Sequence, residues 1–370
     1  PAASAPADAK QESSNPFFLG TVSSQRESGS GARSSALSRL GPGTVIGAGE
    51  KRYELLAAVA RGGMATVWAA REVGKHGLDE LVAVKTMLPE LSDDPDFETM
   101  FLDETRVASR IRHPNVAAIH EVGEEGHVMY LVMEWVEGVT LASLQKAAKD
   151  HGGMPTKVLL RLAAQTCAGL HAAHELRDDA GQSVDLVHRD VTPANVLVDV
   201  HGKVKVVDFG IAKSKGRMHV TKVGSTVKGK TPYLSPEQLG GLPLDRRSDL
   251  FSLGALLYVM ATGLHPFRGD TELKTVENIA LKAPAPPSSI ASDIHPELEK
   301  LILRLLEKDP RKRFANAAEV QAELERIEAA LDDRASDADL EAFVRAHVGA
   351  ELDKQRSELD AALTSIGEAA

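Results

Sequence analysis

Cysteine is almost absent from this sequence. Cys167 is the only cysteine among the 370 residues. A single thiol cannot form an intramolecular disulfide, and it cannot build a metal site out of several thiolates. The scarcity of cysteine fits the reducing cytoplasm, which is where we expect this protein to work.

Long hydrophobic runs are also absent. The longest candidate, residues 250–261, is shorter than the roughly 20 residues that cross a bilayer, and it contains Ser252 and Gly254. We interpret it as a buried core helix. The N-terminus shows no basic region followed by an apolar stretch, so no secretory signal is predicted. We therefore expect a soluble protein with no membrane span.

Positive charge is in deficit. The chain has 43 Lys and Arg against 53 Asp and Glu, and its formal net charge at pH 7 is −10. Proteins that bind nucleic acids usually carry a basic face, so we exclude nucleic acid as a partner. Hydrophobic residues make up 43% and charged residues 26% of the chain, which are globular values and permit a sizeable core.

The first 137 residues divide into two parts by composition. Residues 1–45 are rich in Ser, Ala, Gly and Pro without hydrophobic periodicity, and we predict that they are disordered. Residues 46–137 combine apolar strands with one helical stretch, 97–110, which Pro114 ends. Strands are predicted at 53–60, 66–70, 81–87, 117–122 and 128–134.

The part from 138 to 330 is mainly helical in pattern. A short strand pair interrupts it at 196–199 and 204–207. Helices are predicted at 140–149, 156–177, 236–239, 248–262, 271–281 and 296–306. A small, mostly antiparallel sheet with one helix, followed by a larger helical part, predicts an α+β fold with two lobes.

A helical extension occupies residues 331–370. Its apolar stripe places Leu340, Val344, Val348 and Leu352 four residues apart on one face. Such a stripe buries itself against another surface. The pattern leaves two interpretations open, which are docking on the chain's own domain and dimerisation or binding of a regulatory protein.

The strongest chemical signal lies between residues 188 and 210. The run His-Arg-Asp-Val-Thr-Pro-Ala-Asn starts at His188, and thirteen residues after Asn195 the sequence Asp208-Phe209-Gly210 follows. A hard divalent cation prefers carboxylate and amide oxygens, which Asn195 and Asp208 supply. Asp190 adds a carboxylate that can be aimed at an incoming hydroxyl group.

This arrangement resembles the catalytic and magnesium loops of eukaryotic-like, or Hanks-type, protein kinases. The resemblance implies a protein-kinase-like two-lobed fold, Asp190 as catalytic base, and Asn195 and Asp208 as ligands of magnesium or, alternatively, manganese. It covers roughly residues 53 to 330 and is strongest for soluble bacterial serine/threonine kinases. The form His-Arg-Asp-Val-Thr-Pro is similar to that of myxobacterial members.

Further residues match the same family in the same order. Lys85, in Val82-Ala83-Val84-Lys85, corresponds to the lysine that holds the α- and β-phosphates of ATP. Glu104, on the following helix, corresponds to its ion-pair partner. The resemblance therefore predicts a Lys85–Glu104 pair.

The resemblance also places the adenine of ATP. Residues 131–138 match the segment between the lobes, with Met133 as gatekeeper and the backbone of Glu134 and Val136 pairing with adenine. Other side chains expected at the nucleotide are Val67, Ala83 and Leu197.

Three further matches are structural rather than chemical. Ser235-Pro236-Glu237 takes the place of the family's Ala-Pro-Glu, and Arg313 is expected to be the buried partner of Glu237. Asp249 is expected to hold the backbone of the catalytic loop.

The glycine-rich loop departs from the family pattern Gly-x-Gly-x-x-Gly. Only Gly62 is kept, and Ala60 and Ala65 replace the outer glycines. Because a methyl group restricts φ, we expect these alanines to weaken the grip on ATP.

A second departure concerns a lysine. The family usually has lysine two residues after the catalytic Asp, where this chain has Thr192, and usually has threonine where this chain has Lys230. We interpret this as a swap in which Lys230 supplies the charge for the γ-phosphate and Thr192 supplies the hydroxyl. The alternative is that Lys230 is an ordinary exposed lysine.

The segment between Gly210 and Ser235 is polar and contains several hydroxyl residues. Arg189, next to Asp190, offers a cation to a phosphate on this segment. We therefore expect autophosphorylation at Thr221, Ser225 or Thr226.

The sequence thus predicts an ATP-dependent serine/threonine protein kinase that acts on protein substrates in signal transduction. One alternative is a pseudokinase or scaffold that binds nucleotide weakly, which the altered glycine loop and Thr192 favour slightly. A kinase of small molecules is a third interpretation. The matches at Glu237, Asp249 and Arg313 favour a protein kinase instead.

Overall fold

The computed structural model describes residues 40–47, 51–73, 80–88, 95–125, 128–209 and 231–367. Residues 1–39 of the predicted disordered tail lie outside this part. The last residues of that tail are ordered, which corrects its predicted boundary. The Gly43 N–H donates to the carbonyl of Leu55 (2.8 Å), and strand β1 (Val45–Ile46) pairs with β2 (Tyr53–Arg61).

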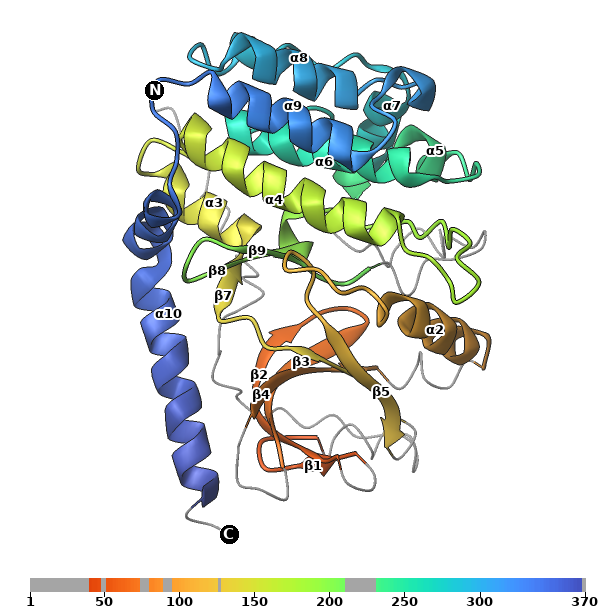
Figure 1. Ribbon diagram of the computed structural model, residues 1–370, viewed down its shortest axis with the longest axis vertical. Helices are drawn as coiled ribbons and strands as arrows, with labels where there is room; N and C mark the ends of the chain where they lie inside the picture. Colours follow the sequence, from red (N-terminus) through yellow and green to blue (C-terminus); the bar gives the residue numbers. More distant parts are fainter. Residues whose placement is uncertain are drawn as a thin grey trace, which may run out of the picture.

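The smaller lobe is an antiparallel sheet with the strand order β1-β2-β3-β4-β6-β5. Its other strands are β3 (Ala65–Glu72), β4 (Glu80–Met87), β5 (Ile119–Glu125) and β6 (Val128–Glu134). The helix α2 (Pro95–Ala108) packs against β5, at one edge of the sheet (Figure 1). All five strands predicted in this region are present.

Side-chain alternation along the strands gives the sheet two different faces. Val82 and Val84 of β4 belong to a small apolar cluster on one face, with Tyr53, Leu55, Trp68, Tyr130 and Val132. The intervening Ala83, together with Leu131 and Met133 of β6, belongs to the main core that continues into the larger lobe. The second face is therefore the one that meets the larger lobe.

The larger lobe is mainly helical and carries a three-stranded sheet, β7-β8-β9, on the side that faces the smaller lobe (Figure 1). The strands are β7 (Gly138–Thr140), β8 (Val196–Asp199) and β9 (Val204–Val206). The helices are α3 (Leu141–Lys149), α4 (Thr156–His174), α5 (Pro236–Leu239), α6 (Arg246–Thr262), α7 (Glu272–Leu281), α8 (Pro296–Leu305) and α9 (Ala317–Ala329). Strand β7 and helix α9 were not among the predicted elements.

Helix α6 forms the centre of the larger lobe. It begins after Asp245, whose side chain accepts a hydrogen bond from the Arg247 N–H, and ends at Gly263 in the left-handed conformation (φ 70°). Most of its side chains are buried, on every face of the helix, as predicted for a core helix. Within the described ranges, no helix is both long enough and apolar enough to cross a membrane.

The C-terminal helix α10 (Asp337–Gly367) packs on the chain's own domain. Its stripe of Leu340, Val344, Val348 and Leu352 is buried in the main core. The helix contacts α3 and β7 of the larger lobe and β2 of the smaller lobe, and Figure 1 shows it along one side of both lobes. Of the two interpretations of the stripe, docking on the chain's own domain is confirmed.

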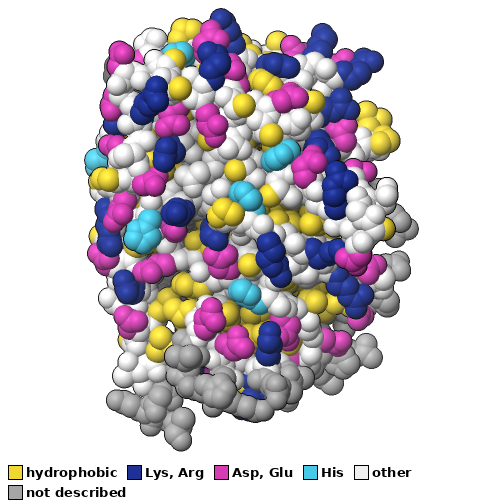
Figure 2. All heavy atoms as spheres, in the orientation of Figure 1, with side chains coloured by type: hydrophobic (Ala, Val, Ile, Leu, Met, Phe, Trp, Pro, Cys, Tyr) yellow, Lys and Arg dark blue, Asp and Glu magenta, His cyan; other side chains and the backbone are white. Residues whose placement is uncertain are grey.

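Charged side chains of both signs are interspersed over the face in Figure 2. Neither sign forms a continuous patch on this face.

Candidate active site

The catalytic-loop backbone is held by Asp249 from helix α6. The Asp249 carboxylate accepts hydrogen bonds from the backbone N–H of His188 (2.7 Å) and of Arg189 (2.8 Å), and from His174 Nε2 (2.8 Å). Asp249 is only 1% exposed. Burial alone would raise its pKa, but the hydrogen bonds from His174 and from the His188 backbone outweigh burial and lower the pKa. The role expected for Asp249 is confirmed by these bonds.

His188 supports the same loop from inside. Burial lowers the pKa of His188, so the ring is neutral and can accept at one nitrogen and donate at the other. The Asp190 N–H donates to His188 Nδ1 (3.2 Å), and His188 Nε2 bonds the carbonyl of Val207 (3.0 Å). The His188 ring also contacts Phe209, with 4.6 Å between centroids.

The carboxylate of Asp190 is oriented by Asn195. Asn195 Nδ2 donates to Asp190 Oδ2 (2.9 Å) and to the Asp190 carbonyl (2.8 Å). Asp190 is 8% and Asn195 5% exposed, so both sit at the inner end of the site. The 3₁₀ turn that follows Thr192, Pro193–Asn195, brings the amide back over the acid.

Two residues beside these groups hold an unusual backbone conformation. Arg189 has φ 64° and Asp208 has φ 58°, in the left-handed region that residues other than glycine rarely adopt. Such conformations cost about 1–3 kcal/mol each and persist where the surroundings impose them, often at functional sites. Both flank the predicted chemistry.

Lys85 reaches the site from the smaller lobe. Strand register places Val67 of β3 opposite Lys85, and Met133 of β6 opposite Ala83. These side chains share the sheet face that meets the larger lobe. Lys85 Nζ lies 2.7 Å from Asp208 Oδ1, so this ion pair connects the two lobes.

Glu104 has a different partner from the predicted one. Arg189 Nη1 lies 3.4 Å from Glu104 Oε1, while Lys85 pairs with Asp208. The predicted Lys85–Glu104 pair is therefore not formed in this structure. Lys85 is instead bound to Asp208 and Glu104 to Arg189, both of the larger lobe, while α2 packs on β5 at the edge of the sheet.

The segment between the lobes follows β6. The Glu134 N–H donates to the carbonyl of Ala118 (2.8 Å), and the Glu134 carboxylate pairs with Lys205 Nζ (2.6 Å). Met133 is 8% exposed. The adenine contacts of Glu134, Val136 and Leu197 stay predictions.

The glycine-rich loop is the turn of the β2–β3 hairpin. The Gly62 N–H donates to the carbonyl of Ala65 (2.9 Å), and Ala60 pairs with Val67. Ala60 and Ala65 lie in strands, and neither has a positive φ. Extended backbone accommodates alanine without strain, so the two methyl groups impose no φ penalty here. The weaker grip on ATP stays a prediction.

Part of the predicted site falls outside the described residues. Lys230 and the predicted phosphorylation sites Thr221, Ser225 and Thr226 belong to it. Thr192 is described, is 4% exposed, and its hydroxyl has no hydrogen-bond partner in the part of the chain that the structure describes. A buried hydroxyl without a partner is costly, so Thr192 stays a candidate functional residue.

Gln238 is a residue that the motif analysis missed. Its side chain donates to the carbonyl of Arg189 (2.9 Å) and accepts from the N–H of Ser235 (2.9 Å). The spacing of Ser235 and Gln238 is that of a helix capping box, which is the signal that could have pointed to it.

Comparison with known proteins identifies the architecture. The family model described as protein kinase domain matches residues 53–324. The chain belongs to the protein kinase family.

Several bacterial kinases are similar to this one. The tyrosine-protein kinase MasK of Myxococcus xanthus is 36% identical over 311 residues, which are 83% of this chain and 48% of MasK. The serine/threonine-protein kinase PknB of Mycobacterium tuberculosis is 36% identical over 282 residues, 75% of this chain and 43% of PknB. This kinase chain thus spans less than half the length of these relatives.

A solved kinase structure has the same fold. The crystal structure of the Mycobacterium tuberculosis PknI kinase domain matches with a TM-score of 0.58 and 24% sequence identity. The match covers 78% of this chain and 98% of the PknI kinase domain. At this identity the likeness shows the fold alone.

The side chains that would hold magnesium in this kinase fit the ion. Because Asn195 Nδ2 is bound to two oxygens of Asp190, its Oδ1 is the atom left for a cation. Asp208 adds a carboxylate, and its side chain is 29% exposed. Magnesium usually takes one or two such oxygens and completes its shell with phosphates and water.

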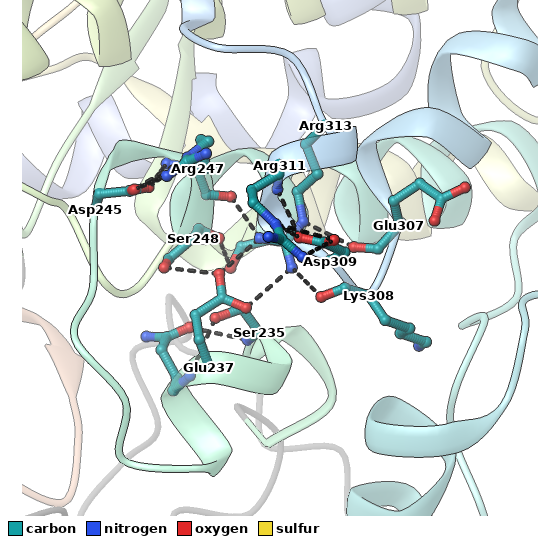
Figure 3. Close-up of polar contacts among 12 residues, drawn as sticks. Ser235, Glu237, Asp245, Arg247, Ser248, Glu307, Lys308, Asp309, Arg311 and Arg313 are labelled. Carbon is teal, nitrogen blue, oxygen red and sulfur yellow. Dashed lines mark hydrogen bonds and ion pairs between the residues drawn. The ribbon is translucent and has the colours of Figure 1, made fainter.

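A buried ion pair joins the start of helix α5 to the segment that follows α8 (Figure 3). Arg313 binds both oxygens of Glu237, at 2.6 and 2.9 Å, and the Ser248 hydroxyl donates to Glu237 (2.8 Å). Burial would raise the pKa of Glu237, but Arg313 outweighs this and lowers it. The pairing predicted for Arg313 and Glu237 is confirmed.

Proposed function

We propose that this chain is a protein kinase that transfers the γ-phosphate of ATP to Ser or Thr hydroxyls of protein substrates, with magnesium as cofactor. The observation that carries the proposal is the pair of hydrogen bonds from Asn195 to Asp190. They fix the carboxylate of the predicted base and leave an amide oxygen for the metal. The names of the bacterial relatives support the same chemistry.

Each residue has a defined task in this proposal. Lys85 binds the α- and β-phosphates, and Asp208 and Asn195 hold magnesium, which neutralises charge on the phosphates. Asp190 accepts the proton of the substrate hydroxyl. Positioning and charge stabilisation supply most of the acceleration, because phosphoryl transfer needs little covalent help from the protein.

The decisive experiment is phosphotransfer from labelled ATP to a generic basic protein. We expect the chain to label the acceptor and Asp190→Asn to lose at least about 100-fold in rate. Asp293→Asn, at an exposed position of the larger lobe, is the matched control. Retained nucleotide binding with no transfer by the unchanged chain would instead support the pseudokinase.

Tyrosine specificity is a second candidate. Two observations favour it, namely the name of the Myxococcus relative and Thr192 in place of the family's lysine. Analysis of the phosphorylated amino acids in the acceptor and in the chain itself separates the two. Phosphotyrosine alone would overturn the proposed serine/threonine specificity.

The swap of Thr192 and Lys230 belongs to the same proposal. The Thr192 hydroxyl is buried and has no hydrogen-bond partner among the described residues, which is costly. This supports the swap, in which the hydroxyl would have a partner at the reaction site. Lys230→Ala is expected to lower kcat and to change the KM for ATP much less. A normally folded Lys230→Ala protein with unchanged turnover would remove the swap.

Phosphorylation between Gly210 and Ser235 would act through Arg189. In the structure Arg189 Nη1 is bound to Glu104, and a phosphate would compete for the same guanidinium. We propose that Thr221, Ser225 or Thr226 receives this phosphate. Mass spectrometry after incubation with ATP tests it, and an unmodified segment in an active kinase would refute it.

A cytoplasmic location, a bacterial origin and the use of magnesium rather than manganese are finer parts of this proposal. The organisms of the similar proteins support the second. We also propose that a partner protein or another kinase regulates the activity of this chain.

A further inference from the structure

Gln238 connects two segments of the site through one carboxamide. Its Nε2 donates to the carbonyl of Arg189 (2.9 Å), and its Oε1 accepts from the N–H of Ser235 (2.9 Å). Gln238 is 8% exposed, so water does not readily replace either bond. The carboxamide is the side-chain group that can donate and accept at this one place.

The carbonyl that Gln238 binds belongs to the peptide preceding Asp190. The N–H of the same peptide is held on its other edge by His188 Nδ1. Arg189 has φ 64°, so its conformation needs support from its surroundings. Gln238 and His188 together fix this peptide plane, and with it the direction in which the Asp190 side chain leaves the backbone.

We propose that Gln238 is a positioning residue for Asp190. Gln238 acts through the Arg189 carbonyl, and its contact with Ser235 ties the catalytic loop to the segment that ends at helix α5. This inference rests on the proposed kinase function.

The test compares a substitution that breaks the bond to Arg189 with one that removes only a helix-capping bond and leaves both side-chain bonds of Gln238 in place. Gln238→Glu keeps an acceptor for the Ser235 N–H but loses the donor to Arg189. We expect kcat to fall about 10- to 100-fold with the KM for ATP changed less than about threefold, since a displacement of about 1 Å at the chemistry costs up to 100-fold. Ser235→Ala removes the hydroxyl that caps Gln238 N and keeps the Arg189 contact, so its kcat should fall less.

Thermal unfolding of each variant checks that it is folded. If Gln238→Glu does not fold, Gln238→Met, uncharged and of similar size, takes its place in the comparison. A folded Gln238 variant with the kcat of Ser235→Ala would overturn the positioning role. If the unchanged chain transfers no phosphate in the same assay, the proposed function fails instead.

A second inference comes from helix α10, which contacts both lobes. Its two halves are held differently. The first half has the buried stripe and ion pairs such as Arg161–Asp337 (2.6 Å). Among the described side chains after Leu352, only Leu359 is buried.

Polar atoms weaken the contact of the second half. Gln355 Nε2 of the second half is buried and has no hydrogen-bond partner among the described residues, and the same holds for Glu351 Oε1 at the boundary between the halves. Each buried polar group without a partner costs about 1–3 kcal/mol. The second half has an ion pair between Arg356 and Glu137 at 3.7 Å, but both side chains are exposed, so this pair adds little. We therefore expect the second half to dock with less net stabilisation than the first half.

We infer that the second half of α10 is a releasable strap that restrains opening of the lobes. A helix fixed to both lobes limits their relative motion, and lobe opening gates nucleotide exchange in enzymes of this kind. Docked, the strap slows release of ADP. Undocked, it permits faster release.

The test follows release of a fluorescent ADP analogue by stopped flow. Leu359→Lys removes the buried leucine of the second half, and Ala361→Lys, at an exposed position of the same half, is the control. We expect release from Leu359→Lys to be at least about threefold faster and amide hydrogen exchange in residues 353–365 to increase. A release rate equal to that of Ala361→Lys would overturn the inference.

Discussion

At the scale of the residue, hydrogen bonds decide which atom of each side chain is left free to bind a ligand. Asn195 commits its nitrogen to Asp190 and keeps an oxygen for a cation. His188 stays neutral because it is buried, and its Nδ1 can therefore accept a hydrogen bond from the Asp190 N–H. Charge and orientation are thus set by neighbours that never touch ATP.

A buried histidine outside the site predicts how stability depends on pH. Burial lowers the pKa of His265 to about 3, and its Nε2 has no hydrogen-bond partner in the described part of the chain. Below pH 6.5 the unfolded chain binds a proton that folded His265 cannot bind, so stability is lost as pH falls through that value. We expect His265→Gln to reduce the loss of unfolding free energy between pH 7.5 and pH 5 by about 1–2 kcal/mol.

Urea unfolding at the two pH values measures the loss. The control is the stability of His265→Gln at pH 7.5, which sets the baseline for the change of side chain. An equal loss in both proteins would show that His265 is protonated in the folded state.

Single-residue chemistry was also the most predictable part of the site. Asp190, Asn195 and Asp208 are close in sequence, so short loops bring them together whatever the rest of the chain does. The partner of Glu104 could not be predicted, because it depends on where α2 packs on the sheet. Gln238 was missed because its role depends on a contact with a loop 49 residues away.

At the scale of the element, a tight turn in the larger lobe supports the docking of α10. Gly202 has φ 77°, and a Cβ there would lie 2.4 Å from Leu340 Cβ of α10. A real Cβ cannot approach so closely, so the turn and the helix fit only without a side chain at this position.

Gly202→Ala should therefore lower the free energy of unfolding by more than backbone strain alone would. Gly181→Ala is the matched control, since Gly181 has φ 76° and open space around its Cβ position. We expect the control to cost about 1 kcal/mol and Gly202→Ala a further 1–3 kcal/mol or so from overpacking. Equal costs in urea unfolding would show that α10 yields to the new methyl group.

The sequence predicted elements well where one periodicity dominates. The strands of the smaller lobe and helix α6 have clear patterns and appear where they were expected. Helix α10 was predicted from its stripe, but the surface that receives it was not, because that surface is assembled from α3, β7 and β2. β7 has three residues and too little pattern to detect.

At the scale of the whole molecule, the Lys85–Asp208 ion pair joins the two lobes at the proposed nucleotide site. A ligand that binds only the folded protein stabilises it by about 2.7 kcal/mol at 100 times its Kd. We expect ATP with magnesium to raise the Tm of the chain and Lys85→Met to lose most of this increase.

The control for this prediction is EDTA, which should remove the part of the increase that depends on the metal ion. Lys300 is an exposed lysine in helix α8, and Lys300→Met should keep the full increase. An increase in Lys85→Met equal to that of the unchanged chain would show that Lys85 does not bind the phosphates.

The position of α10 has a practical consequence for recombinant work. The family match ends at residue 324, whereas the main core includes Leu340, Val344, Val348 and Leu352. A fragment cut at the family boundary would expose the apolar surface that this stripe covers, and exposed apolar patches promote aggregation. Fragments prepared for enzymology should extend through the end of α10, because solubility itself depends on a segment that the family definition omits.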